Sequence, residues 1–246
     1  MVAIFSFTGG AIFGSFLNML LWRLPKGLSI NGRSRCRACD AVIAWYDLIP
    51  VLSFFLLQGR CRQCKHAIHH RYPLVEFACG FIVASFFSIA NPTPAVGLVS
   101  VIGLLILLAL FFFDLFYFLL PDAILIPAII GFIIYALAGP ERGAAFLLSG
   151  LFLAAFFAIL YLMSRGSQLG FGDVKLAGLL GLMFGYPWGA LIVIVGTWIG
   201  GLAAVIMLAK GASRKKELPF GSFLALAAII FIIFNDQFIR IFATYF

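Results

Sequence analysis

Residues 99–116, VSVIGLLILLALFFFDLF, carry a single charged side chain, that of Asp114. The stretch lacks the alternation of polar and apolar residues typical of a strand, and it approaches the roughly 20 apolar residues that a bilayer-crossing helix needs. A charge at membrane depth is costly and is usually retained for a role. The stretch therefore predicts a transmembrane helix that ends at a functional carboxylate.

The composition extends this interpretation to the whole chain. Of its 246 residues, 64% are apolar and 11% are charged, whereas soluble domains are roughly 45–50% apolar and about 25% charged. Water-soluble enzymes, disordered tails and fibrous repeats are therefore excluded. We predict an all-α polytopic membrane protein with about eight transmembrane helices. We place them at 2–22, 73–90, 96–113, 123–138, 144–163, 174–186, 188–208 and 220–235.

This placement divides the chain into three segments. Residues 1–22 form the first transmembrane helix, and 23–72 form the one sizeable polar loop. Residues 73–246 form a membrane core of about seven further helices.

The basic residues indicate the orientation in the membrane. The chain has 17 Lys and Arg against nine Asp and Glu, a net charge of +8. If the eight spans alternate, 15 basic residues fall on one side and only Arg142 and Arg240 on the other. Since positive loops stay in the cytosol, we expect the N-terminus outside and the 23–72 loop inside. The charge then serves topology at the lipid bilayer, and we expect no nucleic acid partner.

Four of the five cysteines form two CxxC pairs in the polar loop, Cys36 with Cys39 and Cys61 with Cys64. Two such pairs can place four thiolates at the corners of a tetrahedron, the geometry of structural Zn²⁺ sites. Cytosolic thiols stay reduced, and the loop has too few large apolar residues to fold alone. We therefore predict a loop stapled by structural zinc. A redox CxxC pair, or a neighbouring histidine as a ligand, is the alternative.

A second carboxylate, that of Asp173, follows Gly170-Phe171-Gly172 at the start of the 174–186 span. The spans of Asp114 and Asp173 run in opposite directions, so we expect both side chains at the cytosolic face. Two carboxylates in one low-dielectric site share a proton. The ionised one can deprotonate water while the protonated one donates to a scissile carbonyl, as in aspartyl proteolysis. The glycines would leave room for a substrate backbone.

Helix capping is the competing explanation for some of these acids. Asp173 directly precedes an apolar run, so a helix N-cap role is an equal alternative for it. Asp122 follows Pro121 at the start of a span, and there we expect an N-cap. Asp114 has no such role, because an acid at the end of a helix opposes the helix dipole.

Short motifs recur along nearly the whole chain in a specific order and spacing. They are GSFLN at 14–18, RLP at 23–25, both CxxC pairs, IPVLS at 49–53, GRC at 59–61, RYPLVE at 71–76, Asp114 with LPD at 120–122, GFGDVK at 170–175 and LPFG at 218–221. Together they resemble the type IV prepilin peptidases, the bifunctional leader peptidases and N-methyltransferases of pilus and type II secretion systems.

This resemblance implies an eight-span aspartyl protease of the GxGD kind in the bacterial cytoplasmic (inner) membrane. Asp114 and Asp173 would be its catalytic pair at the cytosolic face. Such an enzyme removes the basic leader of prepilins and pseudopilins, and methylates the new N-terminus with S-adenosylmethionine. The residues implied to support the active site are Gly170, Gly172, Lys175 and Asp122, and those implied in methyl transfer are Gly59, Arg60 and Glu76.

Three other functions stay open at this point. The protein could be a peptidase without methyltransferase activity, although both CxxC pairs are present. It could be an ion-coupled transporter that uses paired membrane carboxylates, although no internal inverted repeat is evident. It could also be a zinc-stapled scaffold of an envelope assembly. The oligomeric state is left open as well.

Overall fold

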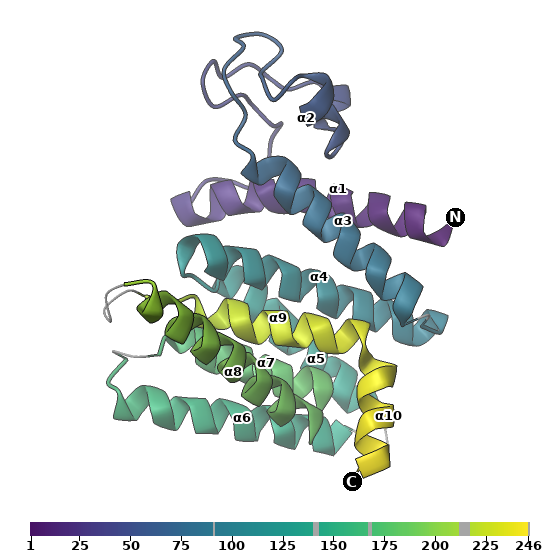
Figure 1. Ribbon diagram of the computed structural model, residues 1–246, viewed down its shortest axis with the longest axis vertical. Coiled ribbons are helices and arrows are strands. Elements are labelled where there is room, and N and C mark those ends of the chain that lie inside the picture. The colour runs from purple at the N-terminus through teal and green to yellow at the C-terminus, as the bar shows by residue number, and fades with distance from the viewer. Residues whose placement is uncertain (91, 140–142, 167–168, 212–216, 246) are drawn as a thin grey trace. The chain divides into compact units, whose positions relative to one another are not determined.

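The computed structural model describes residues 1–90, 92–139, 143–166, 169–211 and 217–245. Arg142, one of the two basic residues assigned to the outer side, lies outside these residues. The described residues form helices joined by loops (Figure 1). They divide into two compact units, Met1–Val101 with Ile233–Phe246, and Ile102–Ile232.

The first unit is built on α1 (Val2–Arg23) and α3 (Arg71–Ile89), which pack side by side (Figure 1). Two glycines of α1 allow the backbones to approach closely. A Cβ at Gly10 would lie 2.6 Å from the carbonyl oxygen of Cys79, and one at Gly14 would lie 2.7 Å from the Cα of Glu76. Small residues serve this purpose at helix interfaces in membranes.

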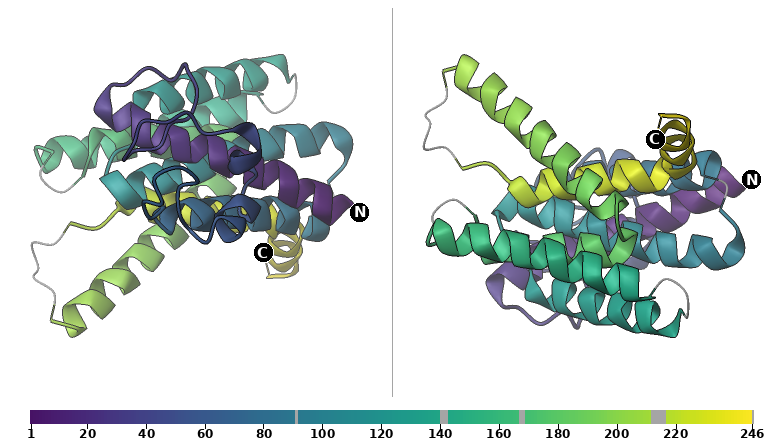
Figure 2. Two further views of the ribbon diagram at one scale, coloured as in Figure 1. Left: turned by 90° about the horizontal axis from the view of Figure 1, so that it is seen from above. Right: turned by 90° about the horizontal axis from the view of Figure 1, so that it is seen from below.

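The loop between α1 and α3 contains three short helices, η1 (Leu24–Lys26), η2 (Trp45–Leu48) and α2 (Leu52–Leu56). Arg23, at the end of α1, holds the start of this loop. Its guanidinium donates hydrogen bonds of 2.7 to 3.3 Å to five successive backbone carbonyls, from Ser29 to Arg33. Seen from above, in the left view of Figure 2, the loop lies over α1 and α3.

The same unit includes a helix beyond the last predicted span. We predicted no helix after residue 235, but Asn235–Tyr245 forms α10. Its apolar residues recur every three or four positions, the pattern of an amphipathic helix. A search for continuous apolar runs does not detect such a pattern.

The second unit surrounds α7 (Phe171–Phe184), of whose 14 residues nine are buried. Helix α7 packs against its neighbours α5, α6 and α8. Its glycines bring α6 close, since a Cβ at Gly181 would lie 2.6 Å from the Cα of Gly150. The other helices of this unit are α4 (Pro94–Tyr117, begun in the first unit), α5 (Asp122–Ala138), α6 (Gly143–Met163), α8 (Trp188–Ala209) and α9 (Phe220–Ile233).

The helices confirm the predicted all-α membrane architecture. Among the described residues, five segments are long and apolar enough to cross a bilayer, namely Val2–Lys26, Arg71–Ile89, Gly97–Tyr117, Gly143–Met163 and Trp188–Ala209. Helices α5 and α9 are apolar but shorter. Each predicted span lies on one of the described helices, and the sixth lies on α7, which begins three residues earlier than expected. The number of eight crossings stays a prediction.

Candidate active site

The second unit brings Asp114 and Asp173 to the same place. Asp114 lies in the last turn of α4 and Asp173 in the first turn of α7, and their exposed fractions are 6% and 9%. Gly221, at the start of α9, lies between them. A Cβ at Gly221 would be 3.2 Å from both Cγ of Asp114 and Oδ1 of Asp173. Two buried carboxylates therefore flank one glycine, which leaves open the space that a side chain would fill.

Asp114 is held by Ser222, the residue after this glycine. The backbone N–H of Ser222 donates to Oδ2 of Asp114 at 2.5 Å, and the Ser222 hydroxyl lies 2.9 Å from the same oxygen. The same hydroxyl lies 3.2 Å from the carbonyl oxygen of Phe111. Because a hydroxyl has one proton, it can donate either to Asp114 or to Phe111. Ser222 can thus donate to an ionised Asp114, or accept from a protonated Asp114 while it donates to the carbonyl.

Asp173 is held by the turn that precedes it. Its Oδ2 accepts a hydrogen bond of 3.1 Å from the backbone N–H of Gly170. Gly170 is the N-cap of α7, and Asp173 lies three residues further on, so the N-cap alternative for Asp173 is wrong. An acid at this third position reaches back to the cap residue, as in a capping box. The N-terminal turns of α7 and α9 also favour negative charge.

The supporting residues lie around this pair. Lys175 Nζ forms an ion pair of 2.5 Å with Asp122 Oδ1, which joins the second turn of α7 to the first residue of α5. The Asp122 side chain is 57% exposed, unlike the buried pair. The N-cap of α5 is Pro121, so the predicted capping role of Asp122 is wrong. Gly172 packs on Leu120, whose Cβ would lie 3.0 Å from a Cβ at position 172.

The first unit brings the four cysteines of the CxxC pairs together. Their sulfur atoms all lie within 4.8 Å of one another, and Cys36 Sγ is 3.7 Å from Cys64 Sγ. Zn–S bonds of about 2.3 Å in a tetrahedron require sulfur separations of about 3.8 Å. The backbone N–H of Ala38 lowers the pKa of Cys36 to about 6, whereas burial and the neighbouring cysteine side chains raise the pKa of Cys64 to about 11. The cluster can therefore hold a zinc ion.

The two cysteine pairs are also structurally alike. RCRAC at 35–39 and RCRQC at 60–64 form equivalent turns, each closed by an isolated bridge, Arg35 with Val42 and Arg60 with Ala67. In each turn the N–H of the first cysteine bonds to a carbonyl five residues later, at 2.9 Å. The two stretches share the pattern RCRxC, and this shared pattern indicates equivalent turns. The CxxC spacing alone does not indicate them.

The three residues implied in methyl transfer lie in the first unit. Gly59 has a positive φ of 66°, and its N–H bonds to the carbonyl of Phe54 at 2.8 Å. Arg60 begins the second cysteine turn. Glu76 is buried in α3 and accepts a hydrogen bond of 2.7 Å from the backbone N–H of Val51. Each of the three therefore also has a local structural contact.

Sequence reasoning missed two residues of the carboxylate site, Gly221 and Ser222. The LPFG motif at 218–221 was noted for the resemblance alone, without a role for its glycine. Ser222 stands 108 positions from Asp114, and nothing local to either residue predicts their contact. The one signal in the sequence was the position of Ser222, a polar residue that directly follows the LPFG motif and lies within an apolar run.

Comparisons with known proteins cover both units. Residues 8–89 match the family described as "Bacterial Peptidase A24 N-terminal domain", and residues 101–206 match the "Type IV leader peptidase family". The second match includes Asp114 and Asp173, and the first includes the four clustered cysteines.

Curated relatives span nearly the whole chain and share one name, prepilin leader peptidase/N-methyltransferase. Those from Stutzerimonas stutzeri and Pseudomonas aeruginosa are 30% and 31% identical, over 93% and 94% of this chain and 89% and 90% of their own. One from Myxococcus xanthus is 34% identical over 84% of this chain and 63% of its own. No solved structure matches significantly. With these relatives along nearly its full length, the chain belongs to the type IV leader peptidase family.

Proposed function

We propose that this protein is a membrane-embedded aspartyl endopeptidase that removes the basic leader of type IV prepilins and pseudopilins. The observation that carries the proposal is the pair of buried carboxylates, Asp114 and Asp173, on either side of Gly221. The relatives' shared name, prepilin leader peptidase/N-methyltransferase, supports the same activity on prepilins.

In the proposed mechanism the two aspartates hold one proton between them. The ionised carboxylate takes a proton from a water molecule, and the resulting oxygen nucleophile attacks the scissile carbonyl. The protonated carboxyl donates to the carbonyl oxygen and so stabilises the tetrahedral intermediate. The proton gained from water then passes to the leaving amine as the peptide bond breaks. Ser222 and Gly170 orient the two carboxylates throughout.

The proposed enzyme also methylates the new N-terminus with S-adenosylmethionine, and residues 23–72 serve this step while 73–246 form the protease. S-adenosylmethionine would supply the methyl group as a sulfonium, a cation that the carboxylate of Glu76 complements. Gly59 and Arg60 are the other proposed residues. Zinc, held by Cys36, Cys39, Cys61 and Cys64, would fix the shape of the loop, because four thiolates leave no open ligand position.

We further propose that the protein lies in the bacterial inner membrane with its N-terminus outside. The 23–72 loop and the aspartates then face the cytosol. The unequal distribution of basic residues supports this orientation. Prepilin leaders, which are basic and enter from the cytosol, would reach the aspartates from that side.

The proposed function is tested by the intact mass of a co-reconstituted prepilin. Incubation with the wild-type enzyme should remove the mass of the leader, and added S-adenosylmethionine should add the mass of one methyl group. Leader loss without methyl gain would limit the protein to peptidase activity. Several prepilins left intact by the wild-type enzyme would refute the peptidase assignment, and would favour a transporter or a scaffold.

Gly221→Ala is expected to lower leader cleavage by about 10²-fold, because its methyl group would press on both carboxylates and displace them. Initial rates on a purified prepilin measure the effect. Gly201→Ala is the matched control, since a Cβ there would meet no atom of the described residues within 4 Å. Equal rates for the two variants would contradict a site around Gly221.

Ser222→Ala is expected to lower kcat about 10-fold or more with little change in KM. A hydrogen bond to a charged group contributes about 1.5–3 kcal/mol, and each 1.36 kcal/mol changes a rate tenfold. Ser222 is 2% exposed, so the control is a pair of equal volume, Ser222→Thr and Ser222→Val. The threonine variant should be faster because it keeps the hydroxyl. Equal rates for this pair would show that Ser222 acts through packing alone.

A further inference from the structure

The segment Trp45–Leu56, which contains η2 and α2, has its polar side chains inside and its apolar side chains outside. Asp47 keeps 9% of its side chain exposed and accepts hydrogen bonds of 2.6 to 3.2 Å from the Arg62 guanidinium. Ser53 is 5% exposed, and its hydroxyl donates to the carbonyl of Tyr46 at 2.9 Å. The exposed side chains are Trp45 at 75%, Leu52 at 52%, Phe55 at 68% and Leu56 at 72%. We call these four residues the apolar patch.

This arrangement is the reverse of a water-facing surface. An aqueous loop would expose the carboxylate and the hydroxyl, and would turn tryptophan, phenylalanine and leucine inward. Contiguous exposed apolar side chains mark a surface that meets a protein or a membrane. The sequence of the segment, WYDLIPVLSFFL, is apolar enough for either.

The depth of the segment along α3 favours the membrane. The backbone N–H of Val51 bonds to Glu76, which lies five residues beyond Arg71, the start of the apolar helix α3. At 1.5 Å per residue this is about 7.5 Å along the helix axis. Amphipathic segments that lie in a membrane surface bury their apolar face by about 5–10 Å. In Figure 1, α2 likewise lies beside α1 and α3 and not beyond their ends.

The backbone at Val51 holds this position firmly. Val51 has φ of 63° and ψ of −52°, which is unusual for a β-branched residue. Such conformations persist where the surroundings impose them. The hydrogen bond from the Val51 N–H to Glu76 holds Val51 against α3, and α2 begins at the next residue, Leu52. The strained turn at Val51 therefore sets the direction in which α2 extends from the point where the segment is bonded to α3.

Helix α3, to which Val51 is bonded, also exposes apolar side chains. Leu74, Phe77 and Phe81 are exposed by 59%, 53% and 58% on a helix that is apolar and long enough to cross a bilayer. Residues three or four apart share one helix face, so these three side chains form one exposed apolar stripe on α3. Segment 45–56 is thus bonded to a helix whose exposed side chains are apolar and which is suited to crossing a bilayer.

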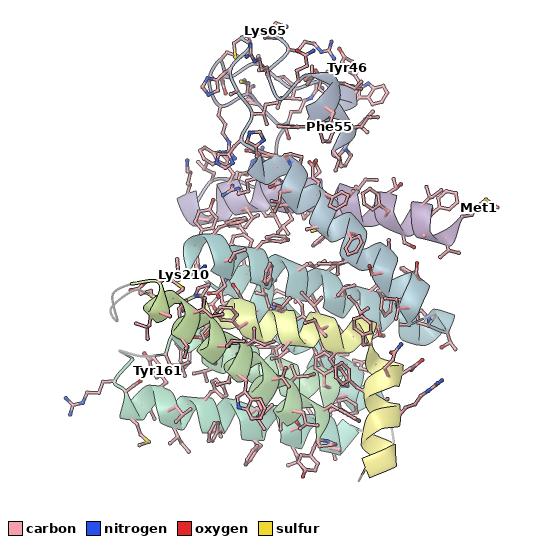
Figure 3. The ribbon with its side chains drawn as sticks, in the orientation of Figure 1. Met1, Tyr46, Phe55, Lys65, Tyr161 and Lys210 are labelled. Carbon is pink, nitrogen blue, oxygen red and sulfur yellow. The ribbon has the colours of Figure 1, made fainter. Side chains whose placement is uncertain are left out.

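The charge of the loop matches one kind of lipid. Residues 24–70 contain seven Lys and Arg and two Asp. Basic residues next to a membrane are attracted to anionic headgroups. Figure 3 shows Phe55 and Tyr46 at the α2 end of the loop and Lys65 away from it. Tryptophan and tyrosine also prefer the interface between lipid and water.

We infer that Trp45–Leu56 is an interfacial membrane anchor. It inserts the apolar patch into the anionic lipid leaflet on the side of the membrane where the loop between α1 and α3 emerges. The zinc-binding turns are thereby held at the membrane surface. Such an anchor would hold the loop in this way whether or not the protein has the proposed enzymatic activity.

The test is fluorescence quenching of Trp45 by brominated lipids. The full chain, with Trp22, Trp188 and Trp198 changed to Phe, is reconstituted in phosphatidylglycerol/phosphatidylcholine vesicles. Bromine near the headgroup should quench Trp45 more strongly than bromine at the bilayer centre, and aqueous acrylamide should quench it weakly. If the triple variant does not fold, the difference in quenching between the wild-type protein and Trp45→Phe gives the same information.

Two variants separate the patch from the rest of the loop. The double variant Phe55→Asp, Leu56→Asp should lose most lipid quenching of Trp45 and speed hydrogen exchange across 45–56. Val42→Asp is the control, an apolar residue with 38% exposure in the first cysteine turn, and should leave the quenching of Trp45 as it was.

Two results would overturn the inference. Strong quenching by acrylamide without quenching by bromolipid would place the patch in water. Protection from both quenchers would mean that protein covers it, either another part of this chain or a prepilin.

Discussion

Asp114→Asn and Asp173→Asn are each expected to reduce leader removal by about 10³-fold or more, while the protein is still made and inserted. Asparagine keeps the shape of the side chain and its bonds to Ser222 or Gly170, but it can neither take up nor release the proton of the pair. General acid and base groups contribute about 10²–10⁴-fold each. Intact mass of the co-reconstituted prepilin, followed over time, gives the rates.

The double variant sharpens this prediction. Because the two carboxylates act as a unit, losing both should slow cleavage little more than losing either one. Asp122→Asn is the matched control, since it makes the same chemical change at a half-exposed acid paired with Lys175. Exposed ion pairs contribute about 0–1 kcal/mol, so this variant should retain much activity. If it lost all cleavage, Asp122 would belong to the catalytic pair, and if both single variants still cut, the assignment of the pair would be wrong.

Cys36→Ser is expected to release zinc and to unfold much of the 24–70 loop. Structural zinc sites contribute about 10–16 kcal/mol of apparent binding free energy, which in small domains is folding free energy. Metal analysis should show about one zinc ion per wild-type chain and little in the variant. Hydrogen exchange of the loop should become faster, and methylation should fall more than cleavage, since the aspartates belong to the other unit.

Cys79→Ala is the control for the zinc prediction. Cys79 is buried in α3 and stands apart from the clustered thiols, so its loss should leave the zinc content as it was. Removal of zinc from the wild-type protein with a chelator should reproduce Cys36→Ser. Equal loss of cleavage and methylation would instead mean that zinc supports the whole fold, and full zinc content in Cys36→Ser would exclude this cysteine as a ligand.

Local features of the amino-acid sequence were enough to identify the class of protein and its candidate groups. Apolar runs as long as 99–116 leave helices as the one structure that satisfies every backbone group in lipid, and the spans drawn from them fall on the observed helices. The CxxC spacing is equally local, so the thiol cluster was predictable. Asp114 was identifiable as a candidate because a charged side chain in an apolar run is costly and is usually retained for a role. Its catalytic role, and that of Asp173, stays a prediction.

How these groups are held depends on the packing of distant segments. Ser222 reaches Asp114 across 108 positions, and Lys175 reaches Asp122 across 53. The start of α7 at Phe171 made Asp173 a residue that bonds back to Gly170 instead of a cap. The apolar patch at 45–56 depends on Arg62 and Glu76, which draw the polar groups of that segment inward. Sequence periodicity reports which face of a helix is apolar, whereas the partner of a buried polar group is set by the packing of distant helices, which no local pattern encodes.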